Sequence, residues 1–312
     1  MILIQINSGL GNQMFQYAFG IALEKHYKCK VYFDINSDFD TPDYRKLELE
    51  PFNLELTKAN IFQLLRYKPL RSYFVNQNNY SLFSKYSIKI VRRFFDKQLY
   101  KFMNYLYDII KIEESDICIY EPSYFDLSKN VNVYFKGYFH NELFFKSIED
   151  EIRNSFKLKN DYLSNSNIAT SIKNSNSVSI HVRRDDYLNH SIFALLSFDY
   201  YAKAIDCIKQ KVNNVRFYVF SDDINVVKQE FICFKEDFVF VEDKLSDNAC
   251  DDLLLMSYCK HNIIANSTYS WWGAWLNSNE NKIVVSPSQW YSDLNMNESV
   301  QMHMLPKSWI VI

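Results

Sequence analysis

The sequence predicts an α/β protein built from two Rossmann-type, doubly wound domains. Short apolar segments of strand length alternate with segments of helical spacing along most of the chain. The chain has 312 residues, which is long enough for two domains of typical size. A polar stretch rich in Asn and Ser, 161–176, separates two such alternating regions and is the expected linker. We therefore expect a first domain over 1–165 and a second over 174–312.

Composition and charge exclude several classes of protein. Lys and Arg total 35 and Asp and Glu total 37, so the net charge of -2 gives no global positive field for nucleic acid. Because no window has the roughly 18 uninterrupted apolar residues of a membrane helix, no transmembrane segment is expected. The first residues are read as a buried strand rather than a signal peptide. The 6 cysteines lie without metal-ligand spacing, which is typical of reduced thiols in a cytoplasmic protein.

The first domain is expected to open as a β-α-β unit. Residues Ile2 to Ile6 predict a strand, a helix should run to about His26, and Lys30 to Asp34 predict a second strand. A helical insertion, rich in aromatic and basic residues, is expected over about 57–112. Its apolar stripe favours core packing, with membrane contact by a basic amphipathic face as the alternative. The remaining predicted elements of this domain are strands at Cys118 to Tyr120 and Val131 to Lys136, and a helix from Asn141 to Phe156.

A glycine turn connects the first strand to the first helix. The dinucleotide fingerprint requires a third glycine where this chain has Met14, so a routine nicotinamide site is excluded. The turn would instead place Gly11, Asn12 and Gln13 at a helix N-terminus, where an anion or a sugar hydroxyl is favoured. Alternatively, the glycines only allow the strand and the helix to pack closely.

Asp38-Phe39-Asp40 is the one Asp-x-Asp sequence of the chain. Such a pair can hold a divalent ion beside a sugar-nucleotide diphosphate. A solvated acidic loop explains it equally, and it lies far in sequence from the basic motif of the second domain.

That basic motif follows the first strand of the second domain. Val178, Ile180 and Val182 alternate with polar residues, which predicts a strand with one buried face. Arg183 and Arg184 then stand at its carboxyl end, where ligands bind in open α/β sheets. A guanidinium fork matches a diphosphate through paired, charge-assisted hydrogen bonds. The alternative is a solvated turn with local ion pairs of little energetic value.

Regular alternation continues to residue 286 and predicts a second parallel sheet with helices on both faces. The predicted elements are helix Phe198 to Val212, strand Val215 to Phe220, helix Asn225 to Phe231, strand Phe238 to Val241, helix Asp247 to Lys260, strand Asn262 to Ala265, helix Tyr269 to Leu276 and strand Lys282 to Ser286.

Three further polar clusters fall at strand ends or helix starts of this sheet. In Ser221-Asp222-Asp223, a carboxylate could accept from ribose hydroxyls or a purine edge, or Ser221 or Asp222 could cap a helix. Ser267 and Thr268 could form a phosphate cradle or serve as a helix cap. Asp251-Asp252 would complement a helix N-terminus. The tryptophans after Thr268 are expected in the core, with Gly273 letting their helix approach the sheet.

Together these blocks make the chain resemble the galactoside α-1,2-fucosyltransferases of glycosyltransferase family 11. The blocks are, in order, Gly9-Leu10-Gly11-Asn12-Gln13-Met14-Phe15-Gln16-Tyr17, His181-Val182-Arg183-Arg184-Asp185-Asp186-Tyr187, Ser221-Asp222-Asp223 and Asn266-Ser267-Thr268-Tyr269-Ser270-Trp271-Trp272. The resemblance spans nearly the whole chain. It implies a GT-B-like pair of domains, GDP-fucose bound mainly in the second domain, inversion at the anomeric carbon and no metal requirement.

The resemblance also implies roles for individual residues. Arg183, weighted above Arg184, would hold the diphosphate, and His181 would touch the donor ribose or phosphate. Asp252 is placed like the acid that reads the guanine edge in related enzymes. The remaining expected donor contacts are Asp222, Ser267, Thr268 and Gly11. The resemblance does not settle which residue assists in removing the acceptor proton. Because the galactose hydroxyl must lose this proton, we expect assistance from a carboxylate, Asp186 or Asp185, or from a polarising Asn12. Gln13 is expected to contact the acceptor.

The expected acceptor is a terminal β-galactose, as part of a lipid-linked oligosaccharide in surface polysaccharide or O-antigen synthesis. A fucosyltransferase of other linkage or acceptor is the nearest alternative. A sugar-nucleotide epimerase or dehydrogenase is disfavoured by the missing glycine and by the absence of a Tyr-x-x-x-Lys pair. A non-catalytic carbohydrate-binding protein would explain the aromatic content but would not need two arginines at a strand end. The enzyme is expected in the cytoplasm, with peripheral membrane contact left open.

Overall fold

A computed structural model of the protein describes residues 1–35, 45–64, 66–67, 98, 109–116, 118–128, 132–184, 192–232, 234, 238–242, 246 and 248–312. The chain forms two compact units. Unit 1 consists of Met1–Glu50 and Leu54–Ser155, and unit 2 consists of Pro51–Asn53 and Phe156–Ile312. Within the described parts, no helix is both long and apolar enough to cross a membrane.

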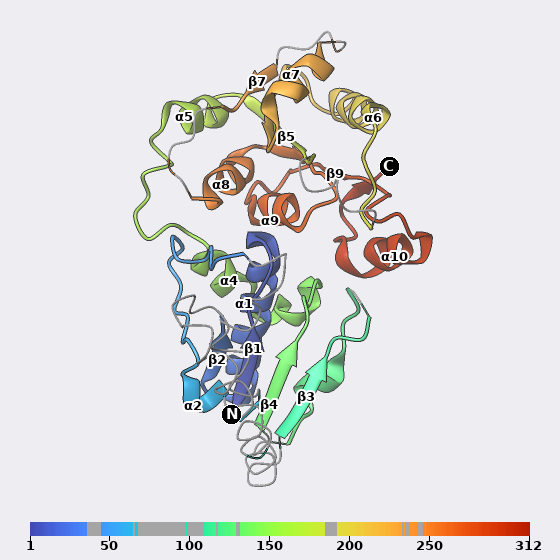
Figure 1. The fold of residues 1–312 in the computed structure, drawn as a ribbon. Coiled ribbons are helices and arrows are strands. Elements are labelled where there is room, and N and C mark those ends of the chain that lie inside the picture. Colours follow the sequence, from blue (N-terminus) through green and yellow to red (C-terminus); the bar gives the residue numbers. More distant parts are fainter. Residues whose placement is uncertain are drawn as a thin grey trace, which may run out of the picture. The chain divides into compact units, whose positions relative to one another are not determined.

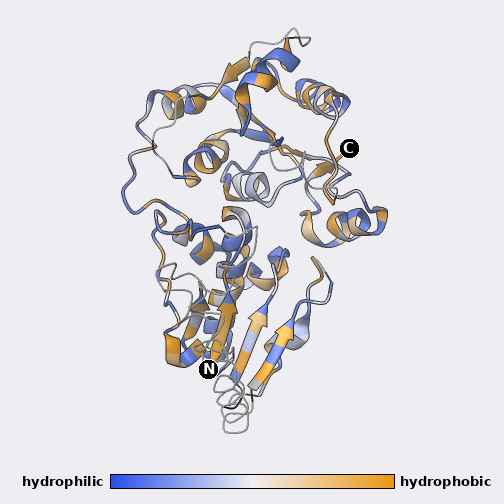
Figure 2. Cartoon of the chain, viewed as in Figure 1, coloured by the Kyte–Doolittle hydropathy of each residue, from blue (hydrophilic) through white to orange (hydrophobic). Residues whose placement is uncertain are grey.

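Unit 1 contains a parallel sheet. Its strands are β1 (Ile2–Gln5), β2 (Val31–Asp34), β3 (Ile109–Glu113) and β4 (Asn132–Lys136). Among the described residues their order is β2-β1-β4-β3, and all pairs are parallel (Figure 1). Helix α1 (Leu10–Tyr27) joins β1 to β2, which confirms the predicted β-α-β opening. Figure 2 shows hydrophobic residues in β1, β3 and β4; those of β1 and β4 are largely buried, as expected for central strands of a parallel sheet, whereas Ile110 on β3 is 41% exposed.

One glycine of α1 lets the helix pack closely on the sheet. A Cβ atom at Gly20 would lie 2.6 Å from Cε1 of the buried Phe33 ring on β2, so only glycine fits there. Gly9 differs, because its φ is -73° and, among the described residues, a Cβ would have only Cδ of Arg45 within 4.0 Å. Close strand-to-helix packing therefore explains Gly20 but does not explain Gly9.

Several boundaries in unit 1 differ from the prediction. The expected strand at Cys118 to Tyr120 is wrong: Cys118 has a left-handed φ of 72°, and the 3-10 helix η2 (Pro122–Phe125) follows. The strand that pairs with β4 is β3, which lies earlier in the chain. The sequence pattern places the isoleucines of β3 at the end of the predicted helical insertion. Most of that insertion, 57–112, lies outside the described residues, and α2 (Ile61–Leu64) is the helix described within it.

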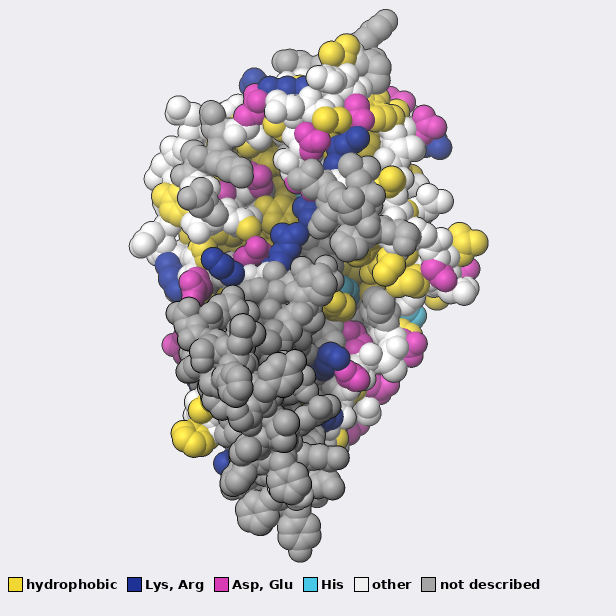
Figure 3. Space-filling model, viewed as in Figure 1, with side chains coloured by type: hydrophobic (Ala, Val, Ile, Leu, Met, Phe, Trp, Pro, Cys, Tyr) yellow, Lys and Arg dark blue, Asp and Glu magenta, His cyan; other side chains and the backbone are white. Residues whose placement is uncertain are grey.

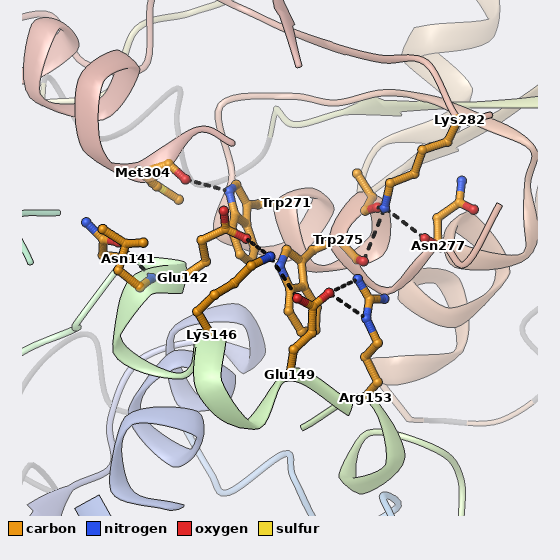
Figure 4. A network of polar contacts seen from close by, with 12 residues as sticks. Asn141, Glu142, Lys146, Glu149, Arg153, Trp271, Trp275, Asn277, Lys282 and Met304 are labelled. Atoms are coloured by element: carbon orange, nitrogen blue, oxygen red, sulfur yellow. Dashed lines mark hydrogen bonds and ion pairs between the residues drawn. The ribbon is translucent and has the colours of Figure 1, made fainter. Parts of the chain in front are cut away.

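The single helix expected from Asn141 to Phe156 is broken into three short elements. These are η3 (Glu142–Phe144), η4 (Lys146–Ile148) and α4 (Glu149–Ser155). The N-H groups of Phe144, Phe145 and Ile148 donate to carbonyls three residues earlier, which is the 3-10 pattern rather than that of a continuous α-helix. On α4, Glu149 accepts from Lys146 at 2.7 Å and from Arg153 at 2.9 Å (Figure 4). Such pairs on a partly exposed helix contribute little to stability.

Unit 2 contains the second parallel sheet. Its strands are β5 (Asn176–Val182), β6 (Val215–Ser221), β7 (Phe238–Phe240), β8 (His261–Ile263), β9 (Val284–Ser286) and β10 (Ile310–Val311). Among the described residues the order is β10-β9-β8-β5-β6-β7. Counted from β5, this is the 3-2-1-4-5-6 order of the Rossmann fold, and the direction of winding reverses between β5 and β8.

The helices that connect these strands agree with the predicted alternation. They are α6 (Phe198–Lys209), α7 (Ile224–Phe231), α8 (Cys250–Tyr258) and α9 (Thr268–Leu276). The C-terminal elements were not predicted: α10 (Leu294–Ser299), the π-helix η6 (Val300–Met304) and β10.

Strand β5 is buried on both faces, not on one as its alternation suggested. Val178, Ile180 and Val182 belong to a hydrophobic cluster with residues of α6 and α7. On the opposite face, Oγ of Ser179 accepts from Nδ2 of Asn262 at 2.8 Å, inside the protein. A central strand of a parallel sheet is covered by helices on both sides, so the polar face is buried and hydrogen-bonded rather than solvated.

The predicted linker, 161–176, contains a packed helix. Helix α5 (Asn167–Lys173) is capped by Ser166, whose Oγ accepts from the Ala169 N-H at 3.2 Å. Ala169 and Ile172 are fully buried. The stretch predicted as a linker therefore contains a packed helix and belongs to unit 2. The structure passes from unit 1 to unit 2 at Ser155.

Helix α9 forms part of the core of unit 2. Trp271 and Trp272 are fully buried with ring centroids 5.1 Å apart, as expected. Gly273 permits close approach to α8 rather than to the sheet, since its Cβ would lie 3.1 Å from Cβ of Met256. Lys282 caps the C-terminal end of α9: its Nζ donates to the carbonyls of Ala274, Trp275 and Asn277 at 2.7 to 3.3 Å (Figure 4).

Candidate functional site

Two arginines and an aspartate meet at the carboxyl edge of the unit 2 sheet. Val182 pairs with Ser221 in the β5-β6 register, so the residues that follow these strands are neighbours. Nη1 of Arg183 lies 3.0 Å from Oδ2 of Asp222, and the Arg184 N-H donates to Oδ1 of Asp222 at 3.0 Å. One carboxylate therefore fixes the backbone and a guanidinium at the strand end.

Arg184 has a second carboxylate partner. Its Nη1 forms an ion pair with Glu230 of α7, while its Nε is buried without a hydrogen-bond partner. Each guanidinium is thus oriented by an acid. Because a guanidinium has five N-H donors and a single carboxylate does not occupy all of them, donors are left for a ligand. The two arginines can donate to phosphate oxygens while keeping these orienting contacts.

His181 lies beside the arginines and is only 4% exposed. Its carbonyl accepts from the Tyr201 hydroxyl at 3.2 Å, and its ring centroid lies 5.5 Å from that of Tyr269. Burial, and secondarily the charge of Arg183, lowers the pKa of His181 to about 3. The imidazole is therefore neutral at physiological pH, and its buried Nδ1 has no hydrogen-bond partner.

Tyr269 joins three segments of the site, and sequence reasoning assigned it no role. Its hydroxyl donates to the Ala249 carbonyl at 2.6 Å and accepts from the Leu253 N-H at 2.9 Å. It thereby ties the first turn of α9 to the first turn of α8, with its ring against His181. Its position directly after Ser267 and Thr268 is the one sequence signal that could have indicated this.

Ser267 and Thr268 open α9 at the end of β8, next to β5. Oγ of Ser267 accepts from the Tyr269 N-H at 3.3 Å, so Ser267 is the helix cap. Nδ2 of Asn266 donates to the carbonyls of Ala194 and Trp290, at 2.8 and 2.9 Å. The capping alternative is thus confirmed, and the phosphate cradle stays a prediction for the same helix N-terminus.

The two acids at the start of α8 have different surroundings. Asp251 is buried and accepts from the hydroxyls of Tyr162 at 2.5 Å and Ser246 at 2.7 Å. Asp252 is partly exposed on the same turn. Asp251 is therefore a structural acid, and the predicted guanine contact of Asp252 stays a prediction.

In the cluster after β6, the cap is Asp223, not Ser221 or Asp222. Its carboxylate accepts from the Val226 N-H at 3.4 Å at the start of α7. Asp222 orients the arginines, which is a different role from the predicted contact with ribose or purine.

The predicted residues of unit 1 lie at the start of α1. Oδ1 of Asn12 lies 3.0 Å from Nε2 of His140, a residue that sequence reasoning missed. Gln13 is 1% exposed and uses its amide to donate to the carbonyls of Ser8 and Lys46 and to accept from the Glu48 N-H. Gly11 is buried inside the helix. Gln13 therefore holds the segment 46–48, and its contact with an acceptor stays a prediction.

Four acids considered from the sequence lie outside the described residues: Asp38, Asp40, Asp185 and Asp186. Within the described ranges, no three His, Cys, Asp or Glu side chains gather in a way that could hold a metal ion. Figure 3 shows Lys and Arg interspersed with Asp and Glu on the visible face rather than gathered in one basic surface. The positive charge at the end of β5 is thus a local feature.

Comparison with known proteins bears on the chain as a whole. Residues 1–312 match the family described as glycosyl transferase family 11. An α-1,2-colitosyltransferase of Escherichia coli is 29% identical over 327 residues, covering 100% of this chain and 99% of that protein. The O-antigen biosynthesis glycosyltransferase WbnK of Escherichia coli is 31% identical, covering 98% of each chain. The galactoside 2-α-L-fucosyltransferase Sec1 of Mus musculus is 25% identical over 139 residues, covering 43% of this chain and 38% of that protein.

Proposed function

Because the chain belongs to glycosyl transferase family 11, we propose that it transfers L-fucose from GDP-fucose to the 2-hydroxyl of a terminal galactose, with inversion at the anomeric carbon. The full-length relatives named for α-1,2-colitosyl transfer and for O-antigen biosynthesis support this linkage and a role in surface polysaccharide synthesis. We also propose that the two units act as the two domains of a GT-B-like enzyme, with the donor held by unit 2.

The arginine pair at the end of β5 is the observation that carries this proposal. It lies where the sheet of unit 2 reverses its winding, which is where α/β sheets bind nucleotides. In fucosyl transfer, the bond from the anomeric carbon to the β-phosphate oxygen breaks and its electron pair stays with GDP. Two guanidiniums already oriented by Asp222 and Glu230 stabilise that developing charge more than the ground state. The two guanidiniums therefore supply the positive charge that a metal ion would otherwise provide.

The surrounding residues suit the rest of a GDP-sugar. Neutral His181 can hydrogen-bond ribose or phosphate oxygen without adding charge. The N-terminus of α9, with Ser267 and Thr268, offers N-H and hydroxyl groups to phosphate. Asp252, in the first turn of α8, is proposed to accept from the guanine N1-H and exocyclic amine.

The galactose 2-oxygen forms the new bond to the anomeric carbon, and its hydroxyl proton must leave. We assign assistance to Asp186, with Asp185 as the second candidate, because a carboxylate can accept a proton from a positioned hydroxyl. At the start of α1, Asn12 is proposed to polarise the acceptor, Gln13 to contact the acceptor, and Gly11 to contact the donor.

Colitosyl transfer is a second candidate function. Colitose is fucose without its 3-hydroxyl, and an α-1,2-colitosyltransferase is similar over 100% of this chain. A site that hydrogen-bonds the 3-hydroxyl would reject the deoxy sugar strongly, whereas an apolar pocket would discriminate only weakly against fucose. The ratio of kcat/KM for the two donors therefore decides between them.

The test is a transfer assay with the purified full chain. GDP-fucose or GDP-colitose is mixed with methyl β-D-galactopyranoside, and GDP release and disaccharide mass are followed, with the linkage read by NMR. We expect an α-1,2-linked product, and about 100-fold slower transfer by Arg183→Ala. Wild-type protein that releases no GDP and makes no disaccharide from either donor, or Arg183→Ala at near-normal turnover, would contradict the proposal.

A further inference from the structure

Strands β1 and β4 are parallel neighbours in the sheet of unit 1, and the segments that follow them are bound together. Nε2 of Gln16 donates to the Gly137 carbonyl at 2.9 Å and to Oδ1 of Asn7 at 2.7 Å. The hydroxyls of Ser8 and Tyr138 lie 3.4 Å apart. These segments lie at the carboxyl edge of the sheet, which is the edge where open α/β sheets bind ligands.

Backbone strain is concentrated at this edge. Ser8 and Phe139 have left-handed φ angles of 61° and 56°. For a large, fully buried residue such as Phe139 this conformation is unfavourable and must be imposed by its surroundings. The buried carboxylate of Glu114 imposes it, accepting from the N-H groups of Tyr138 at 2.6 Å and Phe139 at 3.1 Å. The strained turn delivers the next residue, His140.

His140 is held against the start of α1. Its Nε2 lies 3.0 Å from Oδ1 of Asn12, and its ring packs against Phe15 at 5.0 Å and Tyr138 at 5.1 Å between centroids. It is 4% exposed, and burial lowers its pKa to about 3, so the ring is neutral. Its Nδ1 is buried without a hydrogen-bond partner.

The unpartnered Nδ1 decides which proton arrangement is present. If Nε2 carries the proton and donates to Asn12, a lone pair is left buried at Nδ1. If the Asn12 amide were reversed, its amino group would donate to Nε2. The proton of the neutral ring would then be on Nδ1, and this N-H would be buried without a partner. Because buried N-H groups without a partner are rarer than buried acceptors without one, the first arrangement is favoured.

Resting on the proposed function, we propose that His140 is a positioning residue: it donates from Nε2 to Oδ1 of Asn12 and so turns the Asn12 amino group toward a hydroxyl oxygen of the acceptor sugar. Asn12 is partly exposed and can be reached by a ligand, whereas His140 lies behind it. A carboxamide without such a partner can turn over and exchange its donor for its acceptor. His140 fixes that choice for the sugar and takes no proton from it.

Two variants of similar volume separate positioning from packing. His140→Leu fills the space between the aromatic rings without a donor, and His140→Gln keeps an N-H that can reach Asn12. We expect His140→Leu to lower kcat/KM for methyl β-D-galactopyranoside about tenfold, with the KM for GDP-fucose unchanged. His140→Gln should restore most of this loss. The inference would be overturned if both variants had the same kcat/KM for the galactoside, or if the KM for GDP-fucose changed as much as the galactoside constant.

A double-mutant cycle tests whether His140 acts through Asn12. In a protein that already carries Asn12→Ala, His140→Leu should have little further effect on kcat/KM. If His140→Leu still lowered kcat/KM tenfold there, His140 would not act by positioning Asn12. The control is Asn141→Ala, since Asn141 is adjacent and buried but donates to the Cys118 carbonyl at 2.8 Å. It should lower the melting temperature and leave the galactoside KM unchanged. Wild-type protein without any transfer would instead overturn the proposed function itself.

Discussion

At the scale of single residues, the neutral state of His181 has a measurable cost at low pH. Its folded pKa of about 3 is below the ordinary value of about 6.5, so between these limits the unfolded chain binds more protons. Stability is then fully present above pH 6.5 and falls as the pH drops toward 3. This single histidine should account for about 2 kcal/mol between pH 6.5 and pH 5.

We therefore expect His181→Gln to flatten the pH dependence of the free energy of unfolding by about this amount. Urea unfolding of wild-type and variant protein at pH 7.5, 6.5 and 5 measures it. The exposed His303, changed to Gln, is the control. Parallel stability curves for wild type and His181→Gln would show that the ring is not held neutral.

Asp251 and Asp252 provide a matched pair of neighbouring acids. Asp251→Asn weakens the buried contacts to Tyr162 and Ser246, so it should lower stability by about 1 to 3 kcal/mol and leave GDP affinity nearly unchanged. Asp252→Asn should have the opposite pattern. It should leave stability nearly unchanged, lower the affinity for GDP at least about tenfold, and reduce the preference for GDP over ADP. Calorimetry with GDP and ADP, with melting curves, gives both readouts. Unchanged GDP affinity in Asp252→Asn would move guanine recognition elsewhere.

The residues at the centre of the site could be predicted in part. His181, Arg183 and Arg184 stand out in sequence because charged groups follow an apolar strand. Asp222 was singled out too, but its bond to Arg183 depends on the β5-β6 register. Tyr269 and His140 could not be assigned, since their partners lie 16 or more positions away and are set by packing.

At the scale of elements, two glycines of similar sequence setting should respond differently to alanine. A Cβ at Gly20 would lie within 2.6 Å of the buried Phe33 ring, so Gly20→Ala should cost about 1 to 3 kcal/mol of stability by overpacking. Gly9 has an ordinary φ and room for a Cβ, so Gly9→Ala should leave stability nearly unchanged. Chemical unfolding of both variants tests this. Equal destabilisation would mean that Gly9 also serves internal packing.

The alternation of strand and helix predicted the elements of unit 2 well, because buried parallel strands are continuous apolar runs. It failed at short and exposed elements. The segment after β4 forms 3-10 hydrogen bonds at Phe144 and Phe145 instead of one continuous helix, and the polar sequence of α5 concealed the buried Ala169 and Ile172. The isoleucines of β3 were assigned to the neighbouring helical pattern, and Ile110 is 41% exposed, so no buried apolar run marked this strand.

At the scale of the whole molecule, each unit has a parallel sheet, and polar residues of the sequence motifs follow the central strands β1 of unit 1 and β5 of unit 2. The fold class follows from the sequence because alternation is a property of the whole chain. The identity of the acceptor does not follow from the sequence, because unit 1 carries no transferable motif beyond Gly9 to Tyr17.

Transfer should persist in excess EDTA. The two arginines and the N-terminus of α9 supply the positive potential that a divalent ion would provide to the leaving diphosphate. The assay is initial-rate GDP release from GDP-fucose and methyl β-D-galactopyranoside with and without chelator. Complete loss of activity that Mg²⁺ or Mn²⁺ restores would instead make Asp38 and Asp40 candidate metal ligands.

The most direct test of the diphosphate site is calorimetric titration of GDP into the full chain in EDTA. The wild-type protein should bind one GDP, and Arg183→Ala should bind it about 10- to 100-fold more weakly at an unchanged melting temperature, because a charge-assisted contact to phosphate is lost. Arg216→Ala, an exposed arginine on β6, is the control and should bind like wild type. Wild-type protein that does not bind GDP, or Arg183→Ala that binds it equally well, would contradict the account.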